Sequence, residues 1–506
     1  MFRKILVANR GEIAVRIIRT CREMGIATVA IYSDVDREAK HVRLADEACA
    51  VGAAPPAESY LNIDRVLHAA SSAGADAIHP GYGFLSENAE FAQACERKGF
   101  KFIGPPAAAI RSMGIKTRAR ELMSQAGVPV VPGTPEAADS GQAAAFASQV
   151  GYPVMLKASA GGGGRGMRLV ESAAQLKSAW EQARGEALEA FGDAAAYVEK
   201  AILRPHHVEV QILADEHGTV VHLGERECSL QRRHQKVLEE SPSPLVEANP
   251  SVREQLYSAA IAAASAIGYA NAGTIEFLMD ADCRFYFLEM NTRLQVEHPV
   301  TELVTGMDLV KQQIRVAAGE RLGFSQEAVR FRGHAMECRV YAEDARANFM
   351  PSPGLIRHMA MPDGPGIRVD SGADEGWTVP IHYDPLIAKL CAWAPTRAEA
   401  IDRLRGALRE ATISGIATTL GFFRELMQDP QFQAGDIDTA FLARGIDPAA
   451  SAASAPSLQA RLAAILAVIQ AEQGRAADQA SASVQPSSTW KRNGRIDNIA
   501  ARGTDR

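Results

Sequence analysis

The first 113 residues alternate short apolar runs with stretches of helical periodicity, and this alternation restricts the fold more than any other feature. The apolar runs KILVA and TVAIYS flank a segment in which Ile13, Ile17 and Cys21 are spaced four residues apart. Gly25 follows this segment, and a glycine at that place favours the end of a helix. Strands that alternate with helices predict a parallel, doubly wound α/β sheet.

The rest of the chain divides by composition into three further parts. Residues 114–330 begin with a helical segment and continue with strands around a glycine-rich loop. Residues 331–446 read as mixed α/β. Residues 447–506 contain one amphipathic helix within Ala- and Ser-rich sequence, a composition that predicts disorder.

Charge and cysteine content exclude several classes of protein. The net charge is −6 and no basic block stands out, so we expect no nucleic-acid partner. No apolar run is long enough to span a bilayer, and the N-terminus lacks the apolar core of a signal peptide. The 7 cysteines are scattered and form no Cys-x-x-Cys pair, which favours a reducing compartment and predicts a cytoplasmic protein.

A glycine run at Gly161–Gly164 is a candidate phosphate-binding loop. Backbone amides without side chains can close over phosphate oxygens, and glycine permits the required conformations. No Lys-Ser/Thr pair follows, so the loop is not of the Walker A type. Lys116 and Lys157 could reach phosphates as point charges. The alternatives are a flexible surface linker for the loop and solvated surface positions for the lysines.

Two glutamates interrupt apolar strands that read as an antiparallel hairpin. Glu276 lies in GTIEFL and Glu289 in FLEMN, with the turn near Asp280–Asp282. If the strands pair, two like charges meet near a core, which is unfavourable unless a cation lies between them. Together with the Asn291 amide, these oxygen ligands suit Mg²⁺ or Mn²⁺. The alternative is a buried ion pair with an Arg or Lys.

Polar groups continue at every second residue after Glu289, through Asn291, Arg293 and Gln295 to Glu297. An extended chain would turn all of them to one face. The cationic and acidic pair Arg293 and Glu297 would then lie next to the metal, where a second substrate binds. Glu297 is a candidate general base.

A third polar face is expected on the strand HHVEVQ. His207, Glu209 and Gln211 share one side of it, and a His and a Glu so spaced could bind zinc, but the sequence supplies no matching third ligand. A structural polar face is the alternative. The nearby QRRHQK segment is either an anion site or a solvated charge run.

With these residues in place, the chain resembles the biotin carboxylase family of the ATP-grasp superfamily. The likeness runs from about Phe2 to about Ile446 and is carried by ILVANRGEIAVRIIR, IHPGYGFLSEN, KASAGGGGRGM, RHQKVLEE, EMNTRLQVEHPVTE and AMECRVYAED, in family order. The resemblance implies an ATP-grasp fold with a Rossmann-like N-terminal domain over 1–113. It further implies an ATP-grasp domain over 114–330 with a mobile glycine-loop lid at about 131–203, and a C-terminal α+β domain over 331–446.

The resemblance also implies roles for individual residues. The implied ATP site consists of Lys116, Lys157, Gly163, Gly164, Glu199, Lys200, Ala201, Ile202, His207, Gln231, His234, Glu276, Leu278 and Glu289. The implied metal ligands are Glu276, Glu289 and Asn291. The implied bicarbonate site consists of Lys236, Arg293, Gln295 and Val296. Arg293, Lys236, Glu297 and Arg339 would be catalytic, with Glu297 as the base and Arg339 at the biotin enolate.

The implied reaction carboxylates biotin with ATP, bicarbonate and two Mg²⁺ or Mn²⁺ ions. Glu297 would deprotonate bicarbonate, which attacks the γ-phosphate to give carboxyphosphate. Carboxyphosphate would release CO₂ and phosphate, and the phosphate would remove the biotin N1′ proton. No Ala-Met-Lys-Met motif for attached biotin is present, so we expect the biotin on a separate carrier protein, a separate carboxyltransferase, and a homodimer.

Three other interpretations compete with this one. A different ATP-grasp ligase would use an amine or acid acceptor, and the QVEHPVTE and MECR segments argue against it. A non-catalytic scaffold would be favoured by loss of Glu297 or of a metal carboxylate, and all are present. A dinucleotide oxidoreductase would be supported by VANRGE and the glycine run alone.

Overall fold

The computed structural model describes residues 1–134, 139–158, 167–192 and 194–445, together with Leu462, Ile465, Leu466 and Val468. The predicted glycine loop Gly161–Gly164 lies outside the described residues. The chain forms two compact units, Met1–Asp447 and Pro448–Arg506. In the second unit the four described residues are helical and exposed.

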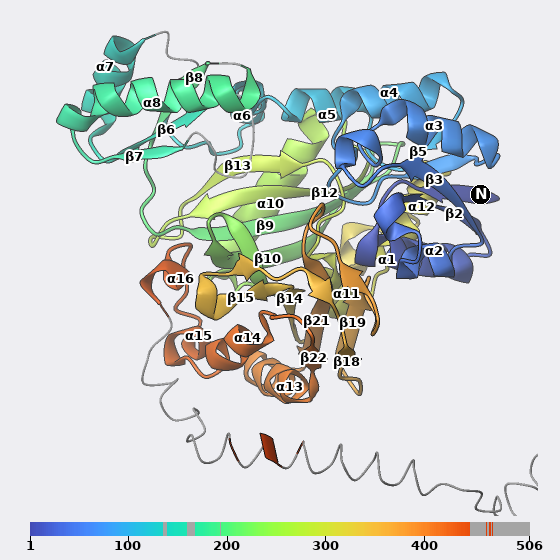
Figure 1. The fold of residues 1–506 in the computed structure, drawn as a ribbon. Helices are drawn as coiled ribbons and strands as arrows, with labels where there is room; N and C mark the ends of the chain where they lie inside the picture. Colours follow the sequence, from blue (N-terminus) through green and yellow to red (C-terminus); the bar gives the residue numbers. More distant parts are fainter. Residues whose placement is uncertain are drawn as a thin grey trace, which may run out of the picture. The chain divides into compact units, whose positions relative to one another are not determined.

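A five-stranded parallel sheet begins the first unit, coloured blue in Figure 1. Its spatial order is β3-β2-β1-β4-β5, and the strands are β1 (Lys4–Val7), β2 (Ala27–Ser33), β3 (Glu47–Gly52), β4 (Ala77–His79) and β5 (Lys101–Phe102). The helices of this part are α1 (Gly11–Glu23), α2 (Lys40–Leu44), α3 (Ile63–Ser72) and α4 (Ala89–Arg97). The predicted doubly wound α/β arrangement is therefore confirmed.

Alternate residues of β1 explain why helices cover both faces of this sheet. Ile5 is buried in one core with Ile13 of α1, while Leu6 is buried in a second core with Val66 of α3. Side chains of successive strand residues point to opposite faces, so a fully apolar strand requires cover on both sides. Helix α1 ends before Gly25, whose φ of +69° is the left-handed conformation expected there.

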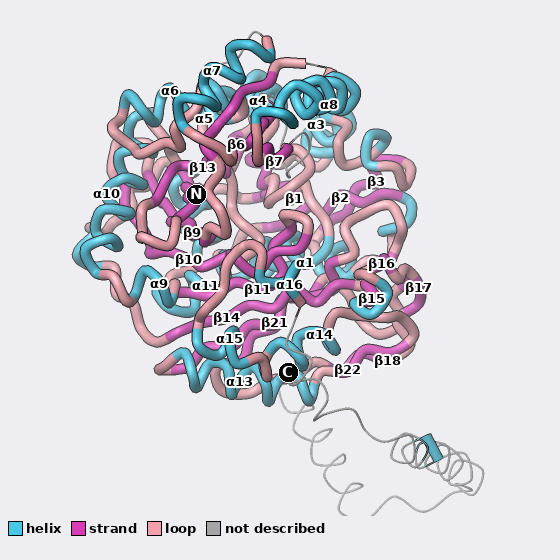
Figure 2. The backbone as a smooth tube through the Cα atoms, turned by 90° about the vertical axis from the view of Figure 1, so that its left-hand side faces the viewer, coloured by secondary structure: helices cyan, strands magenta, loops and turns pink. Residues whose placement is uncertain are grey.

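An eight-stranded antiparallel sheet forms the centre of the first unit (Figures 1 and 2). In order, its strands are β13 (Phe285–Asn291), β12 (Asn271–Met279), β9 (His206–Ala214), β10 (Val220–Arg232), β11 (Gln235–Ser241), β14 (His334–Tyr341), β21 (Leu386–Ala394) and β19 (Ile367–Ser371). In Figure 2 the strands β9, β10, β11, β14 and β21 follow one another from top to bottom. The sheet is thus continuous across residues expected in two different domains.

Helices cover different parts of this sheet. Helix α10 (Pro250–Ala266) buries Leu256 against Val210 of β9, and α12 (Leu309–Ala317) buries Leu309 against Leu213 on the other face of that strand. At the other end, α13 (Arg397–Glu410) buries Leu404 against β14 and β21. The remaining helices near the sheet are α5 (Ala107–Met113), α6 (Lys116–Gln125), α9 (Pro244–Glu247), α11 (His298–Thr305), α14 (Leu420–Leu426), α15 (Pro430–Ala434) and α16 (Phe441–Arg444).

A separate three-stranded sheet projects above the main sheet in Figure 1. It has the order β7-β6-β8, with β6 (Val154–Ala158), β7 (Arg168–Val170) and β8 (Ala196–Lys200), and it is covered by α7 (Ser140–Val150) and α8 (Ala173–Phe191). Its core is formed by Val154, Leu156 and Trp180 among others. The strands predicted on either side of the glycine run are present as β6 and β7, which pair antiparallel, while the run itself lies outside the described residues.

Short two-stranded ladders complete the C-terminal part, formed by β15 (Glu343–Asp344), β16 (Met350–Pro351), β17 (Gly354–Leu355), β18 (His358–Ala360), β20 (Thr378–Val379) and β22 (Thr412–Ser414). All seven cysteines lie among the described residues and are free thiols. Within the described part of the chain, no helix has both the length and the apolar character needed to cross a bilayer.

Candidate active site

The predicted hairpin brings Glu276 and Glu289 together. Strands β12 and β13 pair antiparallel, and Glu276 is the direct register partner of Glu289. Asn291 ends β13 opposite Thr274, so its side chain lies on the same face as Glu289. The sheet therefore places both carboxylates and the amide at one edge, as the alternation of apolar and polar residues predicts.

The Glu276 carboxylate is surrounded by donors. Its Oε1 accepts from Lys236 Nζ at 2.8 Å and from Asn291 Nδ2 at 2.7 Å, and its Oε2 lies 2.9 Å from His207 Nε2. Burial raises the pKa of this carboxyl, but Lys236 and His207 outweigh burial, and the pKa falls far below its usual range. Glu276 thus forms the buried ion pair that was the alternative to a metal site, and its partner is Lys236.

The surroundings of Glu289 differ from those of Glu276, its register partner. Its carboxylate accepts no hydrogen bond from any side chain in the described ranges, and burial followed by the charge of Glu276 raises its pKa. An ionised carboxylate that is desolvated and faces a second carboxylate requires a cation. Glu289, Glu276 and the Asn291 oxygen together form an oxygen donor set that suits Mg²⁺. The residues present therefore fit the implied metal.

Lys236 connects three carboxylates from three different segments. Its Nζ lies 2.6 Å from Glu209 Oε2, 2.8 Å from Glu276 Oε1 and 2.7 Å from Glu297 Oε1. These charges raise the pKa of Lys236 well above its usual value despite its burial. The lysine enters β11 directly after a tight turn at Arg233 and His234, both of which have positive φ.

The structure also supplies the third residue that the possible zinc site on β9 lacked. Ligand atoms of His207, Glu209 and Glu276 lie within 4.8 Å of one another. However, Glu209 already pairs with Arg226 Nε at 2.5 Å and with Lys236. Two cations neutralise this carboxylate without a metal, so the contacts favour the structural polar face over a zinc site.

Extended alternation does not continue past Asn291, because β13 ends there. Arg293 nevertheless reaches back along the chain, donating to Asn291 Oδ1 and to Gln295 Oε1, each at 2.9 Å. Glu297 lies at the start of α11, and the carbonyl of Val296 accepts from Lys389 Nζ at 2.8 Å. The predicted groups are gathered by a turn and a helix start, not by one strand face.

Glu297 is held between two cations. Its Oε1 accepts from Lys236, and its Oε2 accepts from Arg339 Nη2 at 2.9 Å. Burial raises the pKa of Glu297, but Lys236, Arg339 and Arg226 together lower it well below its ordinary value. The carboxylate is thus ionised at neutral pH, which is the state that a general base requires.

Arg339 occupies the far end of this network, on β14. Its Nη2 lies 2.6 Å from Glu239 Oε1 as well as 2.9 Å from Glu297 Oε2. Its Nε is buried and has no hydrogen-bond partner within the described part of the chain. Burial raises the pKa of Glu239 to about 7, against the opposing effect of Arg339. An unsatisfied buried donor is unfavourable, and a bound ligand would satisfy it.

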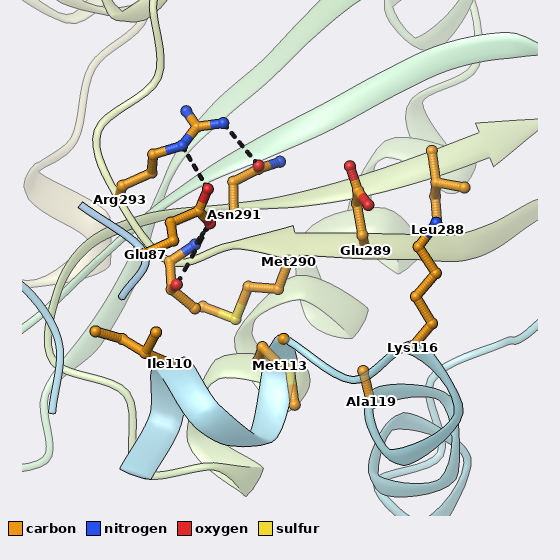
Figure 3. A pocket seen from close by; sticks show the side chains of 12 residues that line it. Glu87, Ile110, Met113, Lys116, Ala119, Leu288, Glu289, Met290, Asn291 and Arg293 are labelled. Carbon is orange, nitrogen blue, oxygen red and sulfur yellow. Dashed lines mark hydrogen bonds and ion pairs between the residues drawn. The ribbon is translucent and has the colours of Figure 1, made fainter. Parts of the chain in front are cut away.

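A pocket of about 340 Å³ opens beside Glu289, between α5, α6 and β13. Figure 3 shows Lys116 and Glu289 on its wall, with Glu87 and Arg293 at its other end. Burial lowers the pKa of Lys116, and Lys157 lowers it further, while Glu289 raises it. Lys116 thus lies close enough to Glu289 for the two charges to interact, and its role as a phosphate ligand stays a prediction.

The other predicted ATP residues are distributed over two sheets. Lys157 of β6 pairs with Glu199 of β8 at 2.5 Å, and Arg120 also contacts that carboxylate. Lys200 donates from Nζ to the Gly151 carbonyl, and Ala201 and Ile202 follow directly. In the described ranges, none of these residues forms a hydrogen bond or ion pair with Lys236 or with its partners Glu209, Glu276 and Glu297. Gly163 and Gly164 lie outside the described residues.

The remaining predicted ATP-site residues lie on β9, on its neighbours β10 and β12, and at the turn that follows β10. Gln231 lies 2.7 Å from His207 Nδ1 through its Nε2, and half-buried Leu278 is the register partner of His207. His234 is exposed at the turn between β10 and β11. The structure thus brings Gln231 and Leu278 to His207, and leaves His234 at the surface.

Three residues that contact the predicted site residues were not predicted from the sequence. Glu87 accepts from Arg293 Nε at 2.8 Å and from the Thr292 backbone amide at 3.0 Å. Glu239 and Lys389 lie on distant strands and contact Arg339 and Val296 respectively. A charged residue within an otherwise apolar strand could have indicated Lys389, whereas Glu239 lies in a strand with several other polar residues and carries no such signal.

Comparison with known proteins agrees with this geometry. Three family models match the chain: "Biotin carboxylase, N-terminal domain" over residues 1–110, "Carbamoyl-phosphate synthase L chain, ATP binding domain" over 116–325, and "Biotin carboxylase C-terminal domain" over 337–444. Together they account for most of the first unit.

Individual relatives match over nearly their whole length. The chain is 55% identical over 442 residues to a biotin carboxylase of Nostoc sp., a match that spans 87% of this chain and 98% of the relative. It is 52% identical over 451 residues to a pyruvate carboxylase subunit of Methanothermobacter thermautotrophicus, spanning 88% and 91%. Among solved structures, the chain matches the biotin carboxylase domain dimer of Hydrogenobacter thermophilus 2-oxoglutarate carboxylase, a complex with MgADP, ADP and bicarbonate. The TM-score is 0.85 and the identity 50%, and the match covers 88% of this chain and 98% of the solved one.

Proposed function

The chain belongs to the biotin carboxylase family, and we propose that its site carboxylates biotin with bicarbonate in a reaction driven by ATP hydrolysis. It is accordingly an ATP-dependent ligase that performs the first half-reaction of a biotin-dependent carboxylase. The observation that carries the proposal is the continuous ionic path from Glu276 through Lys236 and Glu297 to Arg339. Such a path joins a metal-binding carboxylate to a base and to a buried arginine.

ATP is proposed to bind between the small sheet and the main sheet. Lys116 and Lys157 would neutralise phosphate oxygens as point charges. His207, Gln231, His234, Leu278 and the segment Glu199–Ile202 would contact the rest of the nucleotide. Gly163 and Gly164 would close over the phosphates.

Two Mg²⁺ ions, or Mn²⁺, are proposed to be held by Glu276, Glu289 and Asn291. When bound, such ions offset charge on the phosphates and act as Lewis acids. The surroundings of Glu289 support this assignment, because no hydrogen bond or ion pair joins its carboxylate to another described residue, and burial and the charge of Glu276 raise its pKa.

Bicarbonate is proposed to bind where Lys236, Arg293, Gln295 and the Val296 backbone converge. The ionised Glu297 carboxylate would take the bicarbonate O–H proton. A bicarbonate oxygen would then form a bond to the γ-phosphorus while the bond to ADP breaks, giving carboxyphosphate. Lys236 is suited to hold the anion because it already spans Glu276 and Glu297.

Arg339 is proposed to act in the second step. Carboxyphosphate would break down to CO₂ and phosphate, the phosphate would remove the biotin N1′ proton, and N1′ would attack CO₂. The enolate that develops on biotin carries negative charge, and a buried guanidinium offsets such charge strongly. The unpaired Arg339 Nε supports this role.

Biotin is proposed to arrive on a separate carrier protein, with a carboxyltransferase as the next partner and a homodimer as the working form. The dimer of the 2-oxoglutarate carboxylase domain supports the last point. The free cysteines support a cytoplasmic location. We propose no nucleic-acid or membrane partner.

Phosphate release by the full chain tests this function. With Mg²⁺ and ATP, release should require bicarbonate and rise on addition of free biotin. Arg339→Ala should abolish biotin carboxylation and leave some ATP turnover. Release that is indifferent to biotin in the wild-type protein would overturn the proposal.

A further inference from the structure

A layer of buried polar and charged side chains, which includes Arg339, lies on one face of β11, β14 and β21. Alternate residues of β14 point to opposite faces, and Met336, Cys338 and Val340 pack into an apolar core with α13. The other face carries Glu337 and Arg339 on β14, with Glu239 on β11 and Lys389 and Cys391 on β21 as register partners. All five residues are buried.

Like charges stand directly opposite each other in this layer. Glu239 is the register partner of Glu337, and Arg339 is the register partner of Lys389. Direct pairs of like charge destabilise a sheet, whereas diagonal pairs of long side chains can meet. The diagonal Glu239–Arg339 pair does meet, at 2.6 Å. A buried arrangement that conflicts with local stability is expected mainly at functional sites.

Two carboxylates share one nitrogen of Arg339 but have different surroundings. Glu297 contacts Lys236 as well as Arg339. Glu239 is 0% exposed, and among the described residues Arg339 is the one cation within ion-pair distance of it. Glu239 is therefore dedicated to the arginine, while Glu297 also faces the bicarbonate site.

The difference matters during the proposed reaction, on which this inference rests. When Glu297 accepts a proton from bicarbonate, it loses its charge and holds Arg339 less strongly. Glu239 lies outside the proton transfer and keeps its contact. We infer that Glu239 is a positioning residue that holds the Arg339 guanidinium in place while biotin is carboxylated.

Loss of Glu239 should impair the carboxylation of biotin more than the ATP-dependent activation of bicarbonate. Loss of the Glu239 charge should leave Lys236, Arg293 and Gln295 in place, because none of them forms a hydrogen bond or ion pair with Glu239, whose one ion pair in the described residues is with Arg339. Arg339 would then be free to shift, and misplacement by about 1 Å can lower a rate by about a hundredfold. The ratio of carboxybiotin formed to ATP hydrolysed is thus the quantity that Glu239 should control.

Three variants of the full chain test this role. Glu239→Gln keeps the shape and removes the charge, and Glu239→Asp keeps the charge and shortens the reach. Glu240→Gln is the matched control, because Glu240 is the next residue of β11, is equally buried, and pairs with Arg397 and His334 on the opposite face. Carboxybiotin, ATP hydrolysis and thermal unfolding are measured for each.

We expect Glu239→Gln to lower the ratio of carboxybiotin to ATP hydrolysed by about tenfold, and Glu239→Asp to lower it by less. Glu240→Gln should lose stability and keep the wild-type ratio. A wild-type ratio in Glu239→Gln, or equal changes in Glu239→Gln and Glu240→Gln, would overturn the inference. If Glu239→Gln does not fold, a wild-type ratio in Glu239→Asp overturns it equally. Absence of biotin carboxylation in the wild-type protein would instead refute the proposed function.

Discussion

Glu276 and Glu289 face each other as register partners, yet Glu276 contacts Lys236 and His207 whereas Glu289 accepts no hydrogen bond within the described ranges. The pair is therefore asymmetric: Glu276 pairs with cationic groups of the protein, whereas Glu289 forms no hydrogen bond or ion pair in the described ranges. This asymmetry, and the network that surrounds it, should be visible in stability and in kinetics.

Glu289→Gln should stabilise the protein in the absence of metal and nucleotide, because it removes the charge repulsion between Glu289 and Glu276. The raised pKa of Glu289 means that its ionised form disfavours the fold as pH rises through that pKa. The melting temperature without Mg²⁺ should therefore rise by a few degrees. Wild-type protein should gain stability on addition of MgATP, and the variant should gain much less. An equal gain in both would argue against a metal at Glu289.

Lys236→Met should destabilise the fold by about 3–5 kcal/mol at pH 8, since it leaves Glu209, Glu276 and Glu297 without their shared cation. The loss should shrink at pH 6, where the carboxylates can take up protons. Urea unfolding at the two pH values measures this. Lys4→Met is the control, because the surface pair with Glu47 is worth only about 0–1 kcal/mol. Equal losses at both pH values would contradict the shared-cation interpretation.

Glu240→Gln should reduce stability at neutral pH and have little effect in acid. Burial raises the pKa of Glu240, but Arg397 and His334 lower it to about 2, below the ordinary value of 4.5. The stability from this lowered pKa is present above about pH 4.5 and is lost as the pH falls toward 2. We expect a difference in free energy of unfolding of roughly 3 kcal/mol at pH 7 that decreases below pH 4. A difference that does not change with pH would contradict the ion pair.

Glu87→Gln should weaken bicarbonate binding more than it slows turnover. Glu87 fixes Arg293 Nε and the Thr292 amide from a loop of the N-terminal part. Loss of this contact leaves Arg293 held only by its near neighbours Asn291, Leu294 and Gln295, so the KM for bicarbonate should rise by about threefold to tenfold. Steady-state kinetics with varied bicarbonate measure the change, and Glu90→Gln on the exposed start of α4 serves as the control. An unchanged KM would show that Glu87 does not position Arg293.

The sequence predicts the local parts of this site well. Two apolar runs around one short turn predict the hairpin itself. The pairing of Glu276 with Glu289 also depends on a register shift between Glu276 and Phe277, because the unbroken register would place Leu288 opposite Glu276. Helix α1 and its end at Gly25 follow from spacing that is equally local. The doubly wound sheet follows from the repetition of such units.

Partners brought by distant strands were not predicted, for a physical reason. Glu239 meets Arg339 only because β11 and β14 are neighbours in a sheet built from segments about a hundred residues apart, and no local pattern encodes that order. The alternation from Glu289 to Glu297 correctly groups these residues, but for the wrong geometry, since β13 ends at Asn291 and a turn takes over. Distances among Glu209, Lys236 and Glu297 likewise require the folded sheet.

Transfer of labelled carbon from bicarbonate to biotin is the decisive measurement for the proposed carboxylation of biotin. The full chain is incubated with ATP, Mg²⁺, free biotin and isotopically labelled bicarbonate, and label on biotin is measured together with ADP. The account predicts label on biotin that requires ATP and that disappears in Arg339→Ala. ATP hydrolysis by the wild-type protein without label on biotin, or label that persists in Arg339→Ala, would contradict it.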